Sequence, residues 1–314
     1  MEFKLSFNPE APHKLINYKQ PFLLTGSCFT QHMHEKLAHH MFNTCSQPNG
    51  VVFNPISIAN HLLKVLQGYQ YNNNQLLLYN NLWHTWDHHS SFSHIDPNQA
   101  LLQINTMLNQ AHLQLKKEAP ILIITLGSAW VYKHKLSGNT IVANCHKYPQ
   151  ADFSKELLTV QEIITAFKPF LQATPHIQIF FTISPVRHTK DTLVGNNRSK
   201  AILIQAVHEL CNLHKQCDYF PAYEIIIDEL RDYRFYAKDL VHPNDLAVDY
   251  VWDCFVKTCF DEETKQYVQE VKQYKQMEGH RFLHDGLPEN QKFKEAIHGK
   301  KAQLSSKYQV PVSF

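Results

Sequence analysis

Four short runs of apolar residues most constrain how this chain of 314 residues can fold. Each run is apolar along its length and does not alternate with polar residues, which is typical of strands buried on both faces of a parallel sheet. The runs are Phe22 to Thr25, Ile121 to Leu126, Ile177 to Ile183 and Tyr223 to Ile227. The pattern therefore predicts a parallel β-sheet at the centre of the molecule.

Segments with helical spacing separate these runs. Met33, Leu37 and Met41, for example, share one face of a helix over residues 32–41. The other predicted helices are Pro97 to Lys117, Val160 to Leu171, Ser199 to His214, and one that Asn244 caps and that continues to about Phe260. Because strand and helix alternate, we predict an α/β fold with a flavodoxin-like, doubly wound parallel sheet that binds ligands at the carboxyl ends of its strands.

Two regions interrupt this alternation. Residues 69–92 are rich in Asn, His and Trp and predict an inserted loop region or a short antiparallel piece. The segment beyond Arg281 is polar and Lys-rich, ending in Gln309-Val310-Pro311-Val312, and predicts either an arm or a partly disordered segment. We expect one catalytic domain over residues 1–260 and a C-terminal helical or extended arm over 261–314.

Composition and charge exclude several classes of protein. The net charge is +2 and no stripe of Lys and Arg is present, so we expect no nucleic-acid partner. No run approaches the ~18 apolar residues of a membrane span, and the first residues do not have the pattern of a secretion signal. The seven Cys are scattered without CxxC pairs, which favours reduced thiols in a cytoplasmic protein. Nothing in the pattern indicates an oligomeric state.

A possible nucleophile follows the first predicted strand. Gly26 permits a sharp turn there, and Ser27 then stands at the start of a helix, whose N–H groups favour negative charge. Ser27 could also be a simple capping residue of that turn. Cys28 is a competing nucleophile, because a thiol at a helix start can have a lowered pKa.

An Asp and a His lie three residues apart near the other end of the chain, just before the predicted helix at Asn244. This spacing lets one turn present both side chains, so that Asp239 fixes the tautomer of His242. His242 can then accept the Ser27 proton. We therefore expect Ser27, Asp239 and His242 to form a catalytic triad, with His242 Nε2 hydrogen-bonded to Ser27 Oγ.

These two motifs resemble the first and last blocks of the SGNH, or GDSL-like, hydrolases. More narrowly, four segments resemble the GSCFA family, within the SGNH superfamily: Leu24 to Thr30 (LTGSCFT), Thr125 to Tyr132 (TLGSAWVY), Ser184 to His188 (SPVRH) and Asp228 to Tyr236 (DELRDYRFY). The resemblance runs from about residue 1 to about residue 260. It implies the SGNH version of the flavodoxin-like fold and a serine nucleophile at Ser27.

One departure concerns the oxyanion hole. The usual third block supplies a Gly-x-Asn whose amide helps to hold the oxyanion, and here the matching turn is Gly127-Ser128-Ala129. The donors we expect instead are the backbone N–H groups of Ser27 and Gly50, together with Ser128.

Further candidates line the expected site. His84 and His88, with the nearby Trp residues, predict either a wall on which a sugar stacks or plain loop packing. They and His89 do not have the i,i+4 spacing of a helical zinc motif, so we expect no metal and no cofactor. Trp130, Arg187 and His188 are the other candidates for substrate binding, with a brace for a loop as the alternative role of Arg187.

The expected function is hydrolysis of a small acyl ester, acetyl on a sugar or another hydroxylated compound, through an acyl-serine intermediate. The expected partner is therefore a small-molecule or saccharide ester. An O-acyltransferase with the same triad is one alternative. A non-catalytic binding module with the SGNH fold is the other, and the missing oxyanion Asn motivates it.

Overall fold

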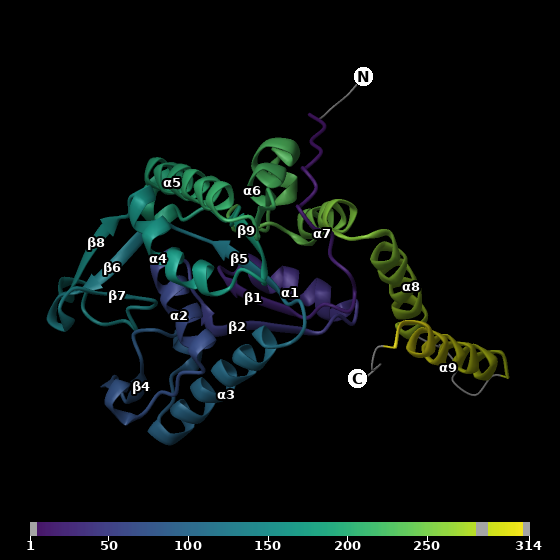
Figure 1. Ribbon diagram of the computed structural model, residues 1–314, viewed down its shortest axis with the longest axis horizontal. Helices are drawn as coiled ribbons and strands as arrows, with labels where there is room; N and C mark the ends of the chain where they lie inside the picture. Colours follow the sequence, from purple (N-terminus) through teal and green to yellow (C-terminus); the bar gives the residue numbers. More distant parts are fainter. Residues whose placement is uncertain (1–4, 281–287, 310–314) are drawn as a thin grey trace.

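A central sheet of five parallel strands organises the computed structural model, which describes residues 5–280 and 288–309 (Figure 1). The strands are β1 (Phe22–Gly26), β2 (Thr44–Val51), β5 (Ile121–Leu126), β9 (Gln178–Ile183) and β10 (Cys217–Tyr219). They lie in the order β10-β9-β5-β1-β2, and every neighbouring pair is parallel. The strand that comes first in the chain thus lies between the second and the third, which is the order of flavodoxin-like doubly wound sheets. The predicted α/β class and parallel sheet are confirmed.

Three of the four predicted strands are present, and the fourth prediction is wrong. Tyr223 to Ile227 belongs to a helical turn, α6 (Ala222–Glu224), that continues as the π-helical segment η6 (Ile225–Leu230). Ile225 and Ile226 are fully buried there, so the run is apolar because it faces the core. A short buried run cannot be assigned to strand or helix by periodicity alone.

Two strands of the central sheet were not predicted because they do not have the pattern of a buried strand. β10 has only three residues, and β2 is largely polar and contains Pro48 and Gly50. β2 tolerates a proline because it is the edge strand of the sheet. Its pairing with β1 also shifts register between Leu24 and Gly26, so the strand is irregular at its carboxyl end.

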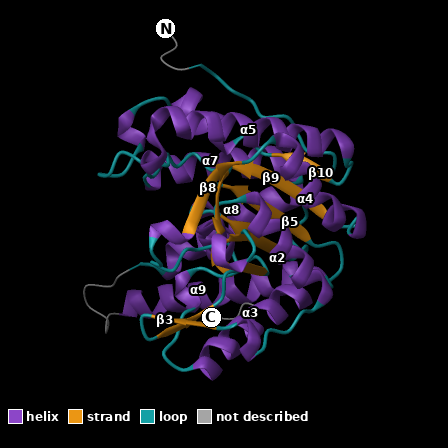
Figure 2. Ribbon diagram, turned by 90° about the vertical axis from the view of Figure 1, so that its left-hand side faces the viewer, coloured by secondary structure: helices purple, strands orange, loops and turns teal. Residues whose placement is uncertain are grey.

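Helices cover both faces of the sheet, and Figure 2 shows the strands between them. One face packs against α1 (Phe29–His39) and α7 (Asp245–Cys259), and side chains of α8 (Glu262–Glu278) join the same buried cluster. The other packs against α2 (Pro55–Gln67), α3 (Pro97–Leu115), α4 (Val160–Ala173) and α5 (Thr192–Leu213). The predicted helices are all present, but α5 starts well before the predicted Ser199, and α2 was not predicted. α8 lies in the arm that was predicted as helical or extended.

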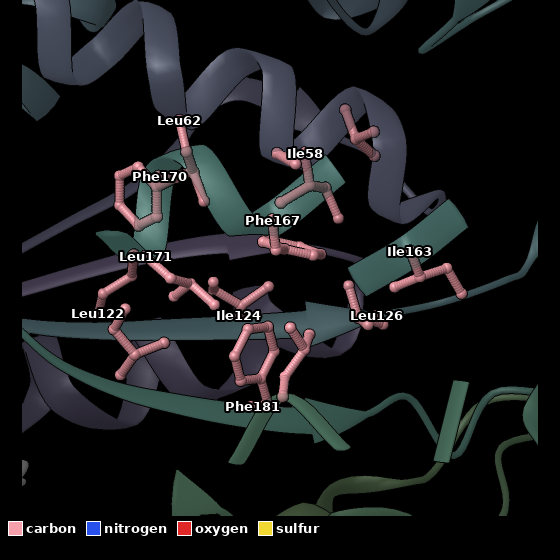
Figure 3. Close-up of a cluster of buried hydrophobic side chains, with 14 of the residues drawn as sticks. Ile58, Leu62, Leu122, Ile124, Leu126, Ile163, Phe167, Phe170, Leu171 and Phe181 are labelled. Atoms are coloured by element: carbon pink, nitrogen blue, oxygen red, sulfur yellow. The ribbon is translucent and has the colours of Figure 1, made fainter. Parts of the chain in front are cut away.

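Side chains of successive strand residues enter different cores. In β1, Leu23 packs with α2 to α5, whereas Phe22 and Leu24 pack with α1 and α7. Figure 3 shows Ile124 of β5 beneath Phe167 of α4, and Leu122 of β5 beneath Phe170 and Leu171 of the same helix. Both faces of the strands are therefore dry, which explains why β1, β5 and β9 are apolar throughout.

Smaller elements lie outside the main sheet. The region over residues 69–92 contains an antiparallel hairpin, β3 (Leu77–Tyr79) and β4 (Leu82–His84). This agrees with the short antiparallel piece, one of the two alternatives predicted for the region. A second antiparallel sheet, β7-β6-β8, was not predicted: β6 (Trp130–His134), β7 (Thr140–Val142) and β8 (Phe153–Leu157). The short 3₁₀ segments are η1 (Asn73–Gln75), η2 (Ser90–Phe92), η3 (Lys135–Ser137), η4 (Gln150–Asp152), η5 (Thr189–Asp191) and η7 (Tyr233–Phe235).

The C-terminal part of the chain is helical where it is described. α8 packs against α9 (Pro288–Tyr308), and the pair extends to one side of the molecule in Figure 1. Tyr267 of α8 and Tyr308 of α9 pack together on Tyr18, with ring centroids 4.9 to 5.1 Å apart. The rest of the predicted arm, residues 281–287 and 310–314, lies outside the described residues, and the division of the chain at residue 260 stays a prediction. None of the described helices has the length and apolar character needed to cross a bilayer.

We expect Gly26→Ala to unfold or strongly destabilise the protein. Gly26 has φ +128°, and a Cβ there would lie 2.1 Å from the carbonyl oxygen of Thr125 in the neighbouring strand. The strained backbone and the clash should together cost about 3 kcal/mol or more. Gly138→Ala is the matched control, because Gly138 also has positive φ (+64°) but no atom within 4 Å of its Cβ position. It should cost only about 1 kcal/mol. Urea denaturation of both variants measures this, and equal losses would show that the strand contact does not require glycine.

Candidate active site

The carboxyl ends of β1, β5 and β9 meet at one edge of the sheet. Ser27 follows β1, Ser128 follows β5, and Ser184 follows β9 directly. Strand order reverses between β1 and β5, which makes this the topological switch point where ligands bind in doubly wound folds. Two side chains named from the sequence, Ser27 and Ser128, thus lie at the edge where a ligand is expected.

Ser27 is held by its backbone and its hydroxyl is unbonded. Its N–H donates to the carbonyl oxygen of Thr125 at 3.0 Å, and its carbonyl accepts from Thr30 N at 2.9 Å as α1 begins. The side chain is fully buried, and Oγ has no hydrogen-bond partner among the described residues. Leaving a buried hydroxyl unpaired costs about 1–3 kcal/mol, so such a group in a folded protein calls for an explanation, a catalytic role among them.

Asp239 and His242 form the expected pair. Oδ2 of Asp239 lies 2.6 Å from Nδ1 of His242, and Oδ1 accepts the backbone N–H groups of Val241 (2.9 Å) and His242 (3.0 Å). The bonds from these two N–H groups and from the imidazole lower the pKa of Asp239 to about 2. The carboxylate therefore stays charged at neutral pH and holds Nδ1 as a donor. Both side chains are about half exposed, His242 at 45% and Asp239 at 50%.

The turn that carries this pair lies near the end of β9 and the start of α1. Arg187, after β9, donates from Nη1 to the Leu240 carbonyl at 3.5 Å. Burial lowers the pKa of His32 in α1 and of His188 after β9, and His242 is close enough to both imidazoles for a proton on it to lower these pKa values further. Residues from opposite ends of the chain thus approach each other at the same edge of the sheet.

The hydrogen bond predicted between His242 Nε2 and Ser27 Oγ is not formed. Ser27 Oγ has no partner, and its side chain is buried whereas His242 is half exposed. Two large cavities, of about 800 and 730 Å³, lie along the N-terminal segment that contains Phe7, and neither Ser27 nor His242 lines them. The structure therefore contains a bonded pair, Asp239 and His242, from the three residues of the predicted triad, and the full triad stays a prediction.

Two of the three expected oxyanion donors are engaged elsewhere, and the third, Gly50, lies in a crowded contact. The Ser27 N–H is bonded within the sheet edge, as described above, and Gly50 packs so closely against His89 that a Cβ would lie 2.5 Å from the His89 Cβ. The Ser128 N–H donates to Phe53 O at 3.0 Å, and its Oγ accepts from Trp130 N at 3.1 Å. The sequence could not indicate the bonds from Ser27 to Thr125 and from Ser128 to Phe53, because each joins segments that are distant in the chain.

Other donors lie at the start of α1. The backbone N–H groups of Phe29 and Cys28 are directed at the Cys28 sulfur and lower its pKa, as does the charge of Lys200. Burial is the larger effect and raises the pKa of the thiol above its usual value. Cys28 is therefore protonated at neutral pH, which makes it a poor nucleophile, while the two N–H groups can donate hydrogen bonds to an anion.

His84 and His88 lie in the packing of the inserted region. Both are buried, and their rings are bonded locally: His84 Nδ1 to Ser93 Oγ and His88 Nδ1 to Thr85 Oγ1, each at 2.6 Å. The His88 ring also packs against Phe92. Of the two alternatives predicted from the sequence, these contacts support loop packing. The two rings do not form a wall on which a sugar stacks, because both are buried.

The remaining candidates, Trp130, Arg187 and His188, support the site from its edge. Trp130 Nε1 donates to Gly195 O at 3.2 Å, which fixes β6 to α5. Arg187 stacks on the Tyr236 ring at 4.4 Å in addition to its bond to Leu240, so it braces the Asp239–His242 turn. Burial lowers the pKa of His188 to about 4, so its imidazole is neutral.

Sequence reasoning missed Lys200. The side chain is buried in α5, and Nζ donates to Gly127 O at 2.7 Å and Ser184 O at 2.6 Å, the residues just after β5 and β9. Burial lowers the pKa of Lys200 to about 7. A signal did exist: Asn196, Ser199 and Lys200 have the i, i+3, i+4 spacing of one helix face. The predicted helix began at Ser199, which divided that face.

A comparison with protein families tests the resemblance directly. The model of the GSCFA family matches residues 21–255, a span that includes Ser27, Lys200, Asp239 and His242. Searches of curated proteins and of solved structures gave no match. Because the family model covers well over half of the sequence, the chain belongs to the GSCFA family.

Proposed function

We propose that this protein is a serine hydrolase of the SGNH, or GDSL-like, type that cleaves a small acyl ester, with acetyl on a sugar or another hydroxylated compound as the substrate class. The observation that carries the proposal is the Asp239–His242 pair, held near the edge of the sheet at which Ser27 follows Gly26. The strand order supports it, because this edge is where doubly wound folds bind ligands.

The proposed chemistry is acyl transfer through Ser27. Ser27 Oγ attacks the ester carbonyl carbon while His242 Nε2 takes the hydroxyl proton, and Asp239 holds Nδ1–H of the resulting imidazolium. The tetrahedral intermediate then expels the alcohol, which receives that proton from His242. Water repeats the sequence on the acyl-serine and releases the acid. The oxyanion accepts hydrogen bonds from the backbone N–H groups of Cys28 and Phe29 at the start of α1.

This reaction needs a contact that the structure does not have, between Ser27 Oγ and His242 Nε2. We propose that the turn carrying His242 moves toward Ser27, because His242 is half exposed and the turn has few packing contacts to lose. Ser27 is fixed by the Thr125 bond and by the start of α1. Substrate binding would thus bring the turn over Ser27 and complete the triad.

Two alternative functions are each supported by a specific observation. An O-acyltransferase would have the same residues and pass the acyl group to a hydroxyl, for which the exposed turn leaves access. Turnover that depends on an added hydroxyl acceptor would identify it. A binding module without catalysis is favoured by the burial of the Ser27 side chain, which is 0% exposed and so leaves its hydroxyl no open path to a substrate. Failure of the wild-type protein to form an acyl-enzyme would favour that reading.

We expect Ser27→Ala to abolish acylation by nitrophenyl acetate while the protein stays folded, because the variant loses only the attacking oxygen. Cys28→Ala should retain most of the acylation rate, since burial keeps that thiol protonated. Burst kinetics and the mass of the intact protein measure both. If Cys28→Ala is the inactive variant and Ser27→Ala still carries an acyl group, the nucleophile is Cys28.

Asp239→Asn should lower the acylation rate by about two to four orders of magnitude, because the amide no longer fixes the donor tautomer of His242. Asp232→Asn is the matched control. Asp232 also accepts a backbone N–H two residues on, from Arg234, in an exposed turn, but it has no bond to an imidazole. The control should acylate at the wild-type rate. Comparable losses in both variants, measured by stopped-flow burst kinetics, would assign Asp239 to loop structure alone.

A further inference from the structure

Lys200 joins the two strand ends next to the proposed nucleophile. Its side chain is 2% exposed, and its two hydrogen bonds are to main-chain carbonyls after β5 and β9. Ser199 is its neighbour in α5. Ser199 Oγ accepts a hydrogen bond from Ala129 N at 2.7 Å and lies 3.3 Å from Ser128 Oγ. One face of α5 is thus bonded to the turn that follows β5, Gly127-Ser128-Ala129.

The Lys200 ammonium has no carboxylate within 4 Å in the described part of the chain. A buried charge of this kind is costly, and proteins usually pair it or replace it by an apolar side chain. Two carbonyl dipoles offset only part of that cost. A neutral amine would satisfy both carbonyls equally well with its two N–H groups, so the bonds alone do not explain why a titratable group occupies the position.

The field of Lys200 reaches the start of α1 and the end of β9. Its charge lowers the pKa of Cys28, the residue next to Ser27, and also that of His188. Cys28 in turn is the titratable group that acts on Lys200. In a dry site with a low effective dielectric constant, such a field acts strongly on any negative charge that forms at Ser27.

We propose that Lys200 is the positioning cation of this site: its buried ammonium stabilises the oxyanion that forms when Ser27 is acylated, in place of the amide that the Gly127-Ser128-Ala129 turn does not supply. The inference rests on the proposed function and adds a residue to it. Lys200 acts through its field and through the two strand ends that it joins, while the N–H groups at the start of α1 contact the oxyanion itself.

The test is the single-turnover acylation of wild type, Lys200→Met and Lys190→Met by nitrophenyl acetate. Lys200→Met keeps most of the volume and removes the charge, and it should acylate about 100-fold more slowly or worse, with the half-saturating substrate concentration changed by less than about threefold. Lys190→Met is the control, because Lys190 is exposed in η5. It should acylate at the wild-type rate. Wild-type rates for Lys200→Met in a folded protein would overturn the proposal.

The pH dependence separates a field effect from a purely structural clamp. The pKa of Lys200 is about 7, that of His188 about 4, and that of Cys28 is above its usual 9.0, so Lys200 is the one of these three groups that titrates between pH 7 and 9. The wild-type acylation rate should fall about tenfold or more over that range as the ammonium loses its proton, and this fall should be absent in Lys200→Met. A clamp made of two N–H donors would give no such fall.

Each way of failing is distinguishable. Wild type that forms no acyl-enzyme, or Ser27→Ala that does, overturns the proposed function and this inference with it. Acylation that depends on Ser27 but is indifferent to Lys200→Met overturns the Lys200 role alone. If Lys200→Met does not fold, the wild-type profile decides: a rate that stays flat or rises from pH 7 to 9, in protein that remains folded by circular dichroism, contradicts the field role.

Discussion

The close approach of the β1 backbone to β5 at Gly26 is the constraint on which the candidate site depends. No side chain fits there, since a Cβ would lie 2.1 Å from the Thr125 carbonyl oxygen. That same oxygen accepts the N–H of Ser27, so one carbonyl both excludes a side chain at residue 26 and fixes the backbone of residue 27. The chain must then turn sharply into α1. The orientation of the Ser27 hydroxyl and of the first N–H groups of α1 follows from this contact.

The two halves of the site differ in their surroundings. On one side, Ser27 and Lys200 are buried, and their backbone and side-chain bonds join strand ends to helices. On the other, Asp239 and His242 are half exposed on a turn that Arg187 braces from the edge. Electrostatic effects are strong in the dry half and screened in the wet half. A rigid, low-dielectric wall beside a more exposed turn suits the proposed reaction, in which substrate must enter before the proposed triad closes.

Predictions from the sequence were good where one segment carried its own signal. β5 was predicted at its observed limits and Asn244 caps α7 as expected, because a buried strand or a cap is recognisable from a few consecutive residues. They failed where neighbours in space decide the structure. β2 is a strand because β1 pairs with it, in spite of Pro48, and the run from Tyr223 is helical although its composition suits a strand as well.

By itself, the sequence determined the parts of the site that lie within one turn: Gly26 beside Ser27, and Asp239 three residues from His242. Their geometry depends on local backbone conformation, which short-range residue patterns encode. Only the tertiary structure decided that the Ser27 N–H is taken by Thr125, that His84 and His88 are buried, and that Lys200 lies beneath the ends of β5 and β9. These facts arise from contacts between residues far apart in the chain, whose energies depend on which strands become neighbours, and no local pattern contains that information.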